Sequence, residues 1–95
     1  VTDEQVEEFV SCGGHIELCM LETEPFSGCM TAERWVRICK TVGYDHCLIS
    51  SDHFWDWKTT IPEQFRSFLI RMHDAGASMG DLSAMVEVPR RLLEA

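Results

Sequence analysis

Residues 15–21 alternate between two kinds of side chain, and this alternation constrains the fold more than any other feature of the sequence. In a strand, alternate positions lie on opposite faces. One face is apolar and consists of Ile16, Leu18 and Met20. The other is polar and consists of His15, Glu17 and Cys19. A strand in a parallel sheet needs cover on both faces, and the chain offers no second layer for the polar one. We therefore expect this chain to be part of something larger.

The remaining sequence predicts the order helix, strand, helix, strand, helix, helix. Three helices are expected to begin after a threonine that caps the first turn. These threonines are Thr2, Thr31 and Thr60. The second strand is expected at residues 46–51, and the last helix should begin at Ser78 and break or restart at Pro89. Strands that alternate with helices predict an α/β fold with parallel strands.

Composition limits the partners and the compartment. The formal net charge of −8 disfavours binding to nucleic acid or to an anionic membrane surface. No apolar run approaches the roughly 18 residues that cross a bilayer. The five cysteines are odd in number and include no C-x-x-C pair, which argues against a disulfide framework or a zinc knuckle. We expect a reducing, cytoplasmic setting.

Two runs on either side of the second helix carry a family resemblance. Residues 13–18 read Gly-Gly-His-Ile-Glu-Leu, and residues 42–53 read Val-Gly-Tyr-Asp-His-Cys-Leu-Ile-Ser-Ser-Asp-His. Together they resemble the C-terminal end of barrels in the amidohydrolase superfamily, in a branch related to phosphotriesterases. Ser51-Asp52 is the one sharp motif of this resemblance.

The tail of the chain extends the same resemblance. Residues 75–78 read Ala-Gly-Ala-Ser and precede a short helix ending at Met85, after which residues 88–93 read Val-Pro-Arg-Arg-Leu-Leu. Members of the superfamily often finish with a glycine, a helix, Asn-Pro and Leu-Leu. Val88 stands where asparagine is usual. The resemblance covers nearly the whole chain.

The resemblance implies that residues 1–95 are the C-terminal part of a TIM-type (β/α)8 barrel. They would supply helix six, strand seven, helix seven, strand eight and the terminal helices, with strand seven at residues 13–21 and strand eight at residues 46–52. The chain would then be a fragment or subunit that needs the remainder of the barrel, either on the same polypeptide or on a partner chain.

The resemblance also implies that Asp52 is a catalytic residue and a metal ligand. In that superfamily, the aspartate at the end of strand eight binds the metal and accepts a proton from the bound water. A divalent metal lowers the pKa of bound water to about 7, and a nearby carboxylate takes the proton. The expected metal is zinc, or else manganese or iron, held with further ligands that this chain lacks. The structural alternative for Asp52 is a residue that starts a turn or caps the following amides.

Four other residues are candidates for binding a small-molecule substrate. These are His15, Glu17, His53 and Trp55. Glu17 is costly to bury unpaired, so it either contacts substrate or pairs with a cation on a neighbouring strand, and His15 has the same two interpretations. His53 could equally be an exposed loop residue, and Trp55 could pack beneath its loop. Cys19 and Cys47 are interpreted as structural thiols rather than ligands.

Two classes of function compete at this point. The leading hypothesis is part of a metal-dependent hydrolase that acts on an amide, ester, lactone or phosphoester. The alternative is a non-catalytic α/β interaction module, or a family member that has lost its metal, completed by oligomerisation through the open strand face.

Overall fold

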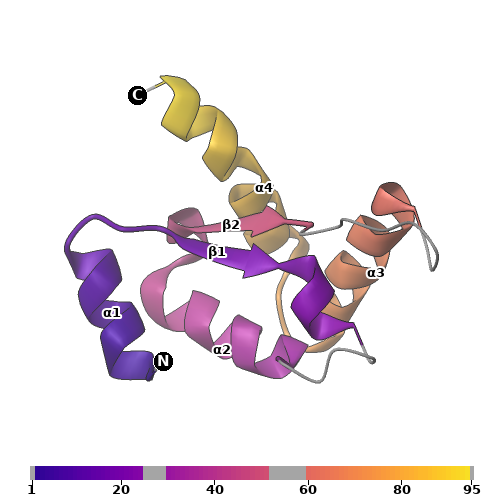
Figure 1. Ribbon diagram of the computed structural model, residues 1–95, viewed down its shortest axis with the longest axis horizontal. Coiled ribbons are helices and arrows are strands. Elements are labelled where there is room, and N and C mark those ends of the chain that lie inside the picture. The colour runs from indigo at the N-terminus through magenta and orange to yellow at the C-terminus, as the bar shows by residue number, and fades with distance from the viewer. Residues whose placement is uncertain (1, 25–29, 52–59, 95) are drawn as a thin grey trace.

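The computed structural model describes residues 2–24, 30–51 and 60–94. The helices are α1 (Asp3–Ser11), α2 (Ala32–Val42), α3 (Ile61–Asp74) and α4 (Met79–Glu94), and the strands are β1 (Ile16–Cys19) and β2 (Cys47–Ser50) (Figure 1). The 3₁₀ turns η1 (Met20–Thr23) and η2 (Tyr44–His46) flank the strands. The predicted order of helices and strands is confirmed.

The helices begin where the capping residues predict. Thr2 forms a capping box with Gln5, because its hydroxyl accepts the Gln5 N–H at 3.2 Å while Gln5 Oε1 accepts the Thr2 N–H at 2.9 Å. Thr31 and Thr60 accept N–H groups in the first turns of α2 and α3. Each cap supplies an acceptor to an N–H group that has no partner inside the helix.

The last helix differs from the sequence expectation at Pro89. Helix α4 runs without interruption from Met79 to Glu94, with Pro89 inside it. A proline removes one helical hydrogen bond but does not prevent the following residues from continuing the helix. The last turns of α4 consequently extend beyond the rest of the molecule (Figure 1).

The two strands form one parallel sheet. Ile16 pairs with Cys47 and Leu18 with Ile49, so these four side chains share a face. The two strands therefore point in the same direction, as their arrows show in Figure 1. The predicted parallel pairing is confirmed.

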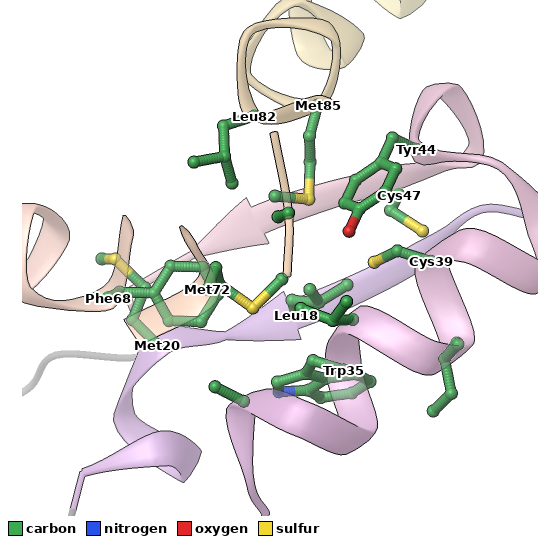
Figure 2. Close-up of a cluster of buried hydrophobic side chains, with 14 of the residues drawn as sticks. Leu18, Met20, Trp35, Cys39, Tyr44, Cys47, Phe68, Met72, Leu82 and Met85 are labelled. Carbon is green, nitrogen blue, oxygen red and sulfur yellow. The ribbon is translucent and has the colours of Figure 1, made fainter. Parts of the chain in front are cut away.

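The core lies against this apolar face. Its buried side chains come from both strands, from all four helices and from the 3₁₀ turns η1 and η2 (Figure 2). Prominent members are Leu18, Trp35, Cys39, Tyr44, Cys47, Phe68, Met72, Leu82 and Met85. A buried side chain of leucine size contributes about 1.5–3 kcal/mol, so this single cluster is the main source of stability.

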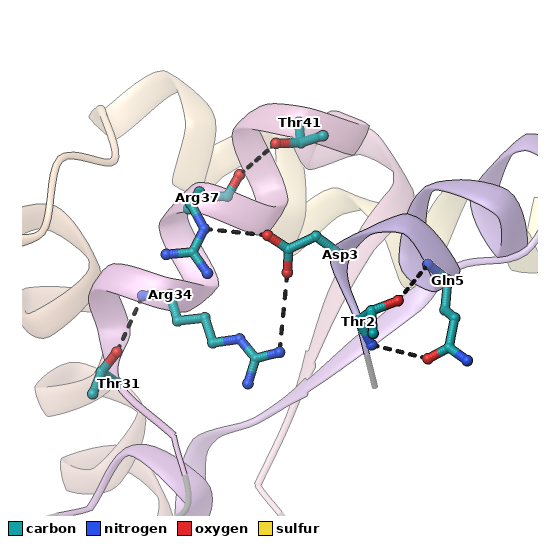
Figure 3. Close-up of polar contacts among 7 residues, drawn as sticks. All are labelled: Thr2, Asp3, Gln5, Thr31, Arg34, Arg37 and Thr41. Carbon is teal, nitrogen blue, oxygen red and sulfur yellow. Dashed lines mark hydrogen bonds and ion pairs between the residues drawn. The ribbon is translucent and has the colours of Figure 1, made fainter.

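Polar contacts fix two outlying elements to the core. Asp3 in α1 lies 3.4 Å from Arg37 and 4.0 Å from Arg34, both in α2 (Figure 3). Arg71 in α3 lies 3.5 Å from Glu24 and donates to the Thr23 hydroxyl in η1. The ion pairs between α1 and α2 are exposed and contribute little free energy. Their main effect is to set the orientation of α1 against α2.

The expected architecture, the last two strand–helix units of a TIM-type (β/α)8 barrel, is wrong for this structure. The described residues form a mostly helical body around one two-stranded sheet. In a barrel each strand pairs with a neighbour on both sides. Among the described residues, β1 and β2 pair only with each other, each over four residues, and the helices supply most of the core instead.

None of the helices in the described part of the chain is long and apolar enough to cross a bilayer.

Candidate functional site

The second face of the sheet is polar and is left uncovered by the described residues. The register places Glu17 beside Leu48 and Cys19 beside Ser50 on this face. Glu17 is exposed, and the other three side chains are partly exposed. This polar sheet face, defined by these four residues, is the candidate site. The contrast between two faces that the sequence predicted for residues 15–21 is confirmed.

Three polar side chains on this face contact one another in a row. The Ser50 hydroxyl donates to Cys19 Sγ at 3.5 Å, and the Cys19 thiol donates to Glu17 Oε1 at 3.6 Å. Hydrogen bonds to and from sulfur are weak and long. The contact with Cys19 therefore orients the Glu17 carboxylate but leaves it able to accept stronger hydrogen bonds. Glu17 remains accessible to a ligand or to a cationic side chain brought from outside.

Two histidines lie at the amino end of the sheet. His15 precedes β1 and His46 precedes β2, and their ring centroids are 5.8 Å apart with the ring planes inclined at 52°. Asp45 Oδ1 lies 4.0 Å from His46 Nε2. The histidine pair therefore lies at the opposite end of the strands from Ser50, where β2 ends. His15 belongs to the amino end, and Glu17 lies between the two ends.

The remaining candidate residues cannot be placed. Asp52, His53 and Trp55 lie outside the described residues. The structure thus brings together His15, Glu17 and Cys19 along the first strand, and the roles predicted for Asp52, His53 and Trp55 stay predictions.

The described residues do not make a metal site by themselves. Within residues 2–24, 30–51 and 60–94, no group of three or more histidine, cysteine, aspartate or glutamate side chains is arranged to hold a metal ion. A metal at this sheet would therefore need ligands from outside the described residues.

Sequence reasoning missed Ser50, a member of the site, and His46, which lies beside His15 at the amino end of the sheet. Neither residue has a distinctive local motif. Only the register, which pairs Ile16 with Cys47, places His46 beside His15 and Ser50 beside Cys19. The signal that could have found His46 is the position of a histidine one residue before each strand, and that signal does not point to Ser50.

The two buried thiols belong to the core and not to this site. Cys39 and Cys47 are fully buried, and their sulfur atoms lie on the same side of Tyr44 in Figure 2. The hydrogen bond with Cys47, together with burial, raises the pKa of the Cys39 thiol. Burial likewise raises the pKa of Tyr44. Cys39 and Tyr44, kept protonated in this way, are poor nucleophiles and poor ligands. The same hydrogen bond lowers the pKa of Cys47, so the structural role of Cys47 is supported by its complete burial in the core. Cys19 differs, because it lies half-exposed on the polar sheet face.

Comparison with known proteins adds no relative. No protein-family model, no curated protein and no solved structure matches the chain. The resemblance to amidohydrolases therefore stays a prediction from the sequence.

Proposed function

We propose that this chain supplies part of the active site of a metal-dependent hydrolase that acts on an amide, ester, lactone or phosphoester. Asp52 is the proposed metal ligand and proton acceptor, and further polypeptide supplies the other ligands. Zinc is the proposed metal, with manganese or iron as the alternatives. The observation that carries the proposal is the one-sided sheet. Its polar face bears the exposed carboxylate of Glu17 on β1, and the two strands end at the same edge.

Several features of the sheet support this proposal. In sheets of parallel strands, ligands bind outside the carboxyl ends of the strands, and β2 ends at Ser50, two positions before Asp52. Hydrolysis needs a water that has lost or is losing its proton, and a positioned carboxylate accepts that proton. In the proposed arrangement Asp52 accepts the proton, while Glu17 contacts the substrate by accepting hydrogen bonds.

The proposed substrate-binding residues receive two different roles. We assign Glu17, His53 and Trp55 to the substrate pocket. His15 lies with His46 at the amino end, so its proposed role changes to contact with whatever polypeptide covers that end of the polar sheet face.

The setting follows from the sequence. Three described cysteines, Cys12, Cys39 and Cys47, are free thiols, which fits the proposed reducing cytoplasm. The proposed partners are a small-molecule substrate and the polypeptide that covers the polar sheet face, and the charge of −8 disfavours nucleic acid.

A second candidate is a non-catalytic interaction module, or a family member that has lost its metal. The apolar side chains exposed on α3 and α4 favour this candidate, because they indicate a surface that contacts another protein.

Metal analysis of the protein as its gene encodes it tests the first proposal. We expect the purified protein to contain zinc, manganese or iron in stoichiometric amount, and Asp52→Asn to lower that content while keeping the circular dichroism of the native fold. The matched control is Asp45→Asn, an exposed aspartate in η2 at the other end of the strand, which should leave the metal content unchanged.

Hydrolysis of a panel of simple esters, lactones, amides and phosphoesters gives the second readout. Turnover should fall with Asp52→Asn and be lost on chelation. Equal metal content in native protein and Asp52→Asn would remove Asp52 from the ligands. Absence of both metal and turnover in the native protein would favour the interaction module.

A further inference from the structure

The outer surface of α3 and α4 carries most of the exposed apolar side chains. Of the seven large apolar side chains that are exposed among the described residues, six lie on these two helices. They are Ile61 and Ile70 on α3, and Met79, Val86, Leu92 and Leu93 on α4. Met79 is 68% exposed and Leu93 is 89% exposed. A cluster of this kind on a charged protein marks a contact surface.

A groove separates the two helices and is open to solvent. Its volume is about 520 Å³. Apolar side chains form most of its walls, namely Phe65, Leu69 and Ile70 from α3 and Met79, Leu82 and Val86 from α4. Some of these side chains already contact the core from the other side, so the groove and the core are adjacent. We call this groove, with the exposed side chains around it, the α3–α4 surface.

The two walls of the groove carry opposite charges. Arg66 lies on the α3 wall and Glu87 lies on the α4 wall. Residues 75–78 connect the helices, and Arg66 lies as many positions before Ala75 as Glu87 lies after Ser78. Since each helical residue advances about 1.5 Å, the two charges are equally far from the connection. Leu93, counted from Ser78, and Ile61, counted back from Ala75, are also nearly equally far from the connection.

Arg66 and Glu87 are both exposed, so a second molecule can reach their charged groups. Arg66 has no hydrogen bond or ion pair with another residue in the described part of the chain. Glu87 lies 2.7 Å from Arg90 on the surface, and Arg90 also lies 3.2 Å from Glu94. If Glu87 formed an ion pair with a second molecule, Arg90 would still have Glu94 as a partner.

We propose that the α3–α4 surface is covered by the same surface of a second copy of this chain, in a dimer whose twofold axis runs along the groove. Such an axis exchanges the α3 and α4 walls while keeping each residue at its distance from the connection. Arg66 of each copy then meets Glu87 of the other. Leu93 at the projecting end of α4 covers Ile61 of the other copy, and the two sets of apolar groove side chains cover each other.

The charges favour a second copy over a helix that carries charge of one sign. An acidic helix would pair with Arg66 but would be repelled by Glu87, and a basic helix would be attracted by Glu87 but repelled by Arg66. A surface with both signs in the exchanged positions satisfies both walls, and this chain carries such a surface. Two such pairs also offset part of the repulsion between two chains of charge −8.

Sedimentation velocity on the protein as its gene encodes it tests the proposal. We expect a dimer at micromolar concentration, and a monomer for Met79→Glu with unchanged circular dichroism. Arg66→Glu and Glu87→Arg should each raise the dissociation constant about tenfold or more, because each places like charges opposite one another. The combined variant, Arg66→Glu with Glu87→Arg, should return the dissociation constant close to that of the native protein.

The control is Glu8→Arg, a charge reversal on the exposed face of α1, away from the groove. It should leave the dissociation constant unchanged. A monomeric native protein at tens of micromolar overturns the proposal. So does a dimer that ignores both single reversals, or one that the combined reversal fails to restore.

Discussion

Gly43 holds a backbone conformation that connects α2 to the second strand. Its φ is +99°, and a Cβ atom built there would lie 2.7 Å from Asp45 Oδ1. Left-handed backbone strains any residue that has a Cβ atom. The turn therefore depends on glycine at this position, and the register of β2 against β1 depends on the turn.

Replacement of Gly43 by alanine should lower the free energy of unfolding by about 1–2 kcal/mol. Urea denaturation measures this directly. Gly80→Ala is the matched control, because Gly80 is inside α4 and its added Cβ would make only an ordinary contact with Ser78. There alanine should stabilise the protein by about 0.5–1 kcal/mol. Equal effects of the two substitutions would contradict the role given to Gly43.

Cys39 predicts how stability depends on pH. Its pKa is raised in the folded protein by the hydrogen bond with Cys47 and by burial, whereas an unfolded thiol titrates near about 8.5. Above that pH the folded chain holds a proton that the unfolded chain loses. The stabilisation is therefore complete below about pH 8 and is lost as pH rises, by at most about 1.4 kcal/mol per pH unit.

Urea denaturation between pH 7 and pH 10 tests this dependence. The slope above pH 8.5 should become flatter when both buried thiols are replaced, in the combined variant Cys39→Ala with Cys47→Ala, because burial raises the pKa of Cys47 once its hydrogen bond with Cys39 is lost. The slope should stay unchanged in Cys12→Ala, whose thiol is exposed. Tyr44 also has a raised pKa, but unfolded tyrosine titrates near about 10, so its contribution begins at higher pH. An unchanged slope in the combined variant would show that the buried thiols are not responsible.

At the scale of elements, α4 depends on its first turn. The Ser78 hydroxyl accepts the Asp81 N–H at 3.0 Å, and the Asp81 carboxylate accepts the Ser78 N–H at 3.0 Å. This reciprocal pair is a capping box. It fixes the start of the helix that covers β2 and forms one wall of the groove.

Loss of this cap should have a measurable cost. Ser78→Ala should lower the free energy of unfolding by about 1 kcal/mol. Ser67→Ala, at an exposed position inside α3, should change it by less than about 0.5 kcal/mol. Thermal denaturation of both variants compares the two effects, and a smaller loss for Ser78→Ala than for Ser67→Ala would contradict the capping role.

Local signals predicted the elements well, and long-range pairing explains where they failed. The caps at Thr2 and Thr31 and the two-faced first strand depend only on neighbouring residues, so the sequence predicted them. Strand β1 was expected to continue to residue 21 but ends at Cys19, where its partner β2 also ends. The pairing of His15 with His46 depends on register, which no local pattern encodes.

At the scale of the whole molecule, the two faces of the sheet differ in burial and polarity. Leu18 is fully buried in the core, whereas its neighbour Glu17 is exposed on the polar sheet face. The number of strands and their surroundings are set by contacts between distant segments. The alternation of strands and helices predicted the parallel pairing correctly, whereas the family resemblance implied a barrel, which the structure contradicts.

Substitution of these two adjacent residues tests the central claim, that the polar sheet face serves function and the apolar face serves stability. Leu18→Ala should lower the free energy of unfolding by about 2–5 kcal/mol. Glu17→Ala should change it by less than about 0.5 kcal/mol, yet lower hydrolytic turnover about tenfold or more through a lost hydrogen bond to substrate. Denaturation and turnover are measured on the same preparations. The claim is contradicted if Glu17→Ala is as destabilising as Leu18→Ala, or if Glu17→Ala keeps full turnover.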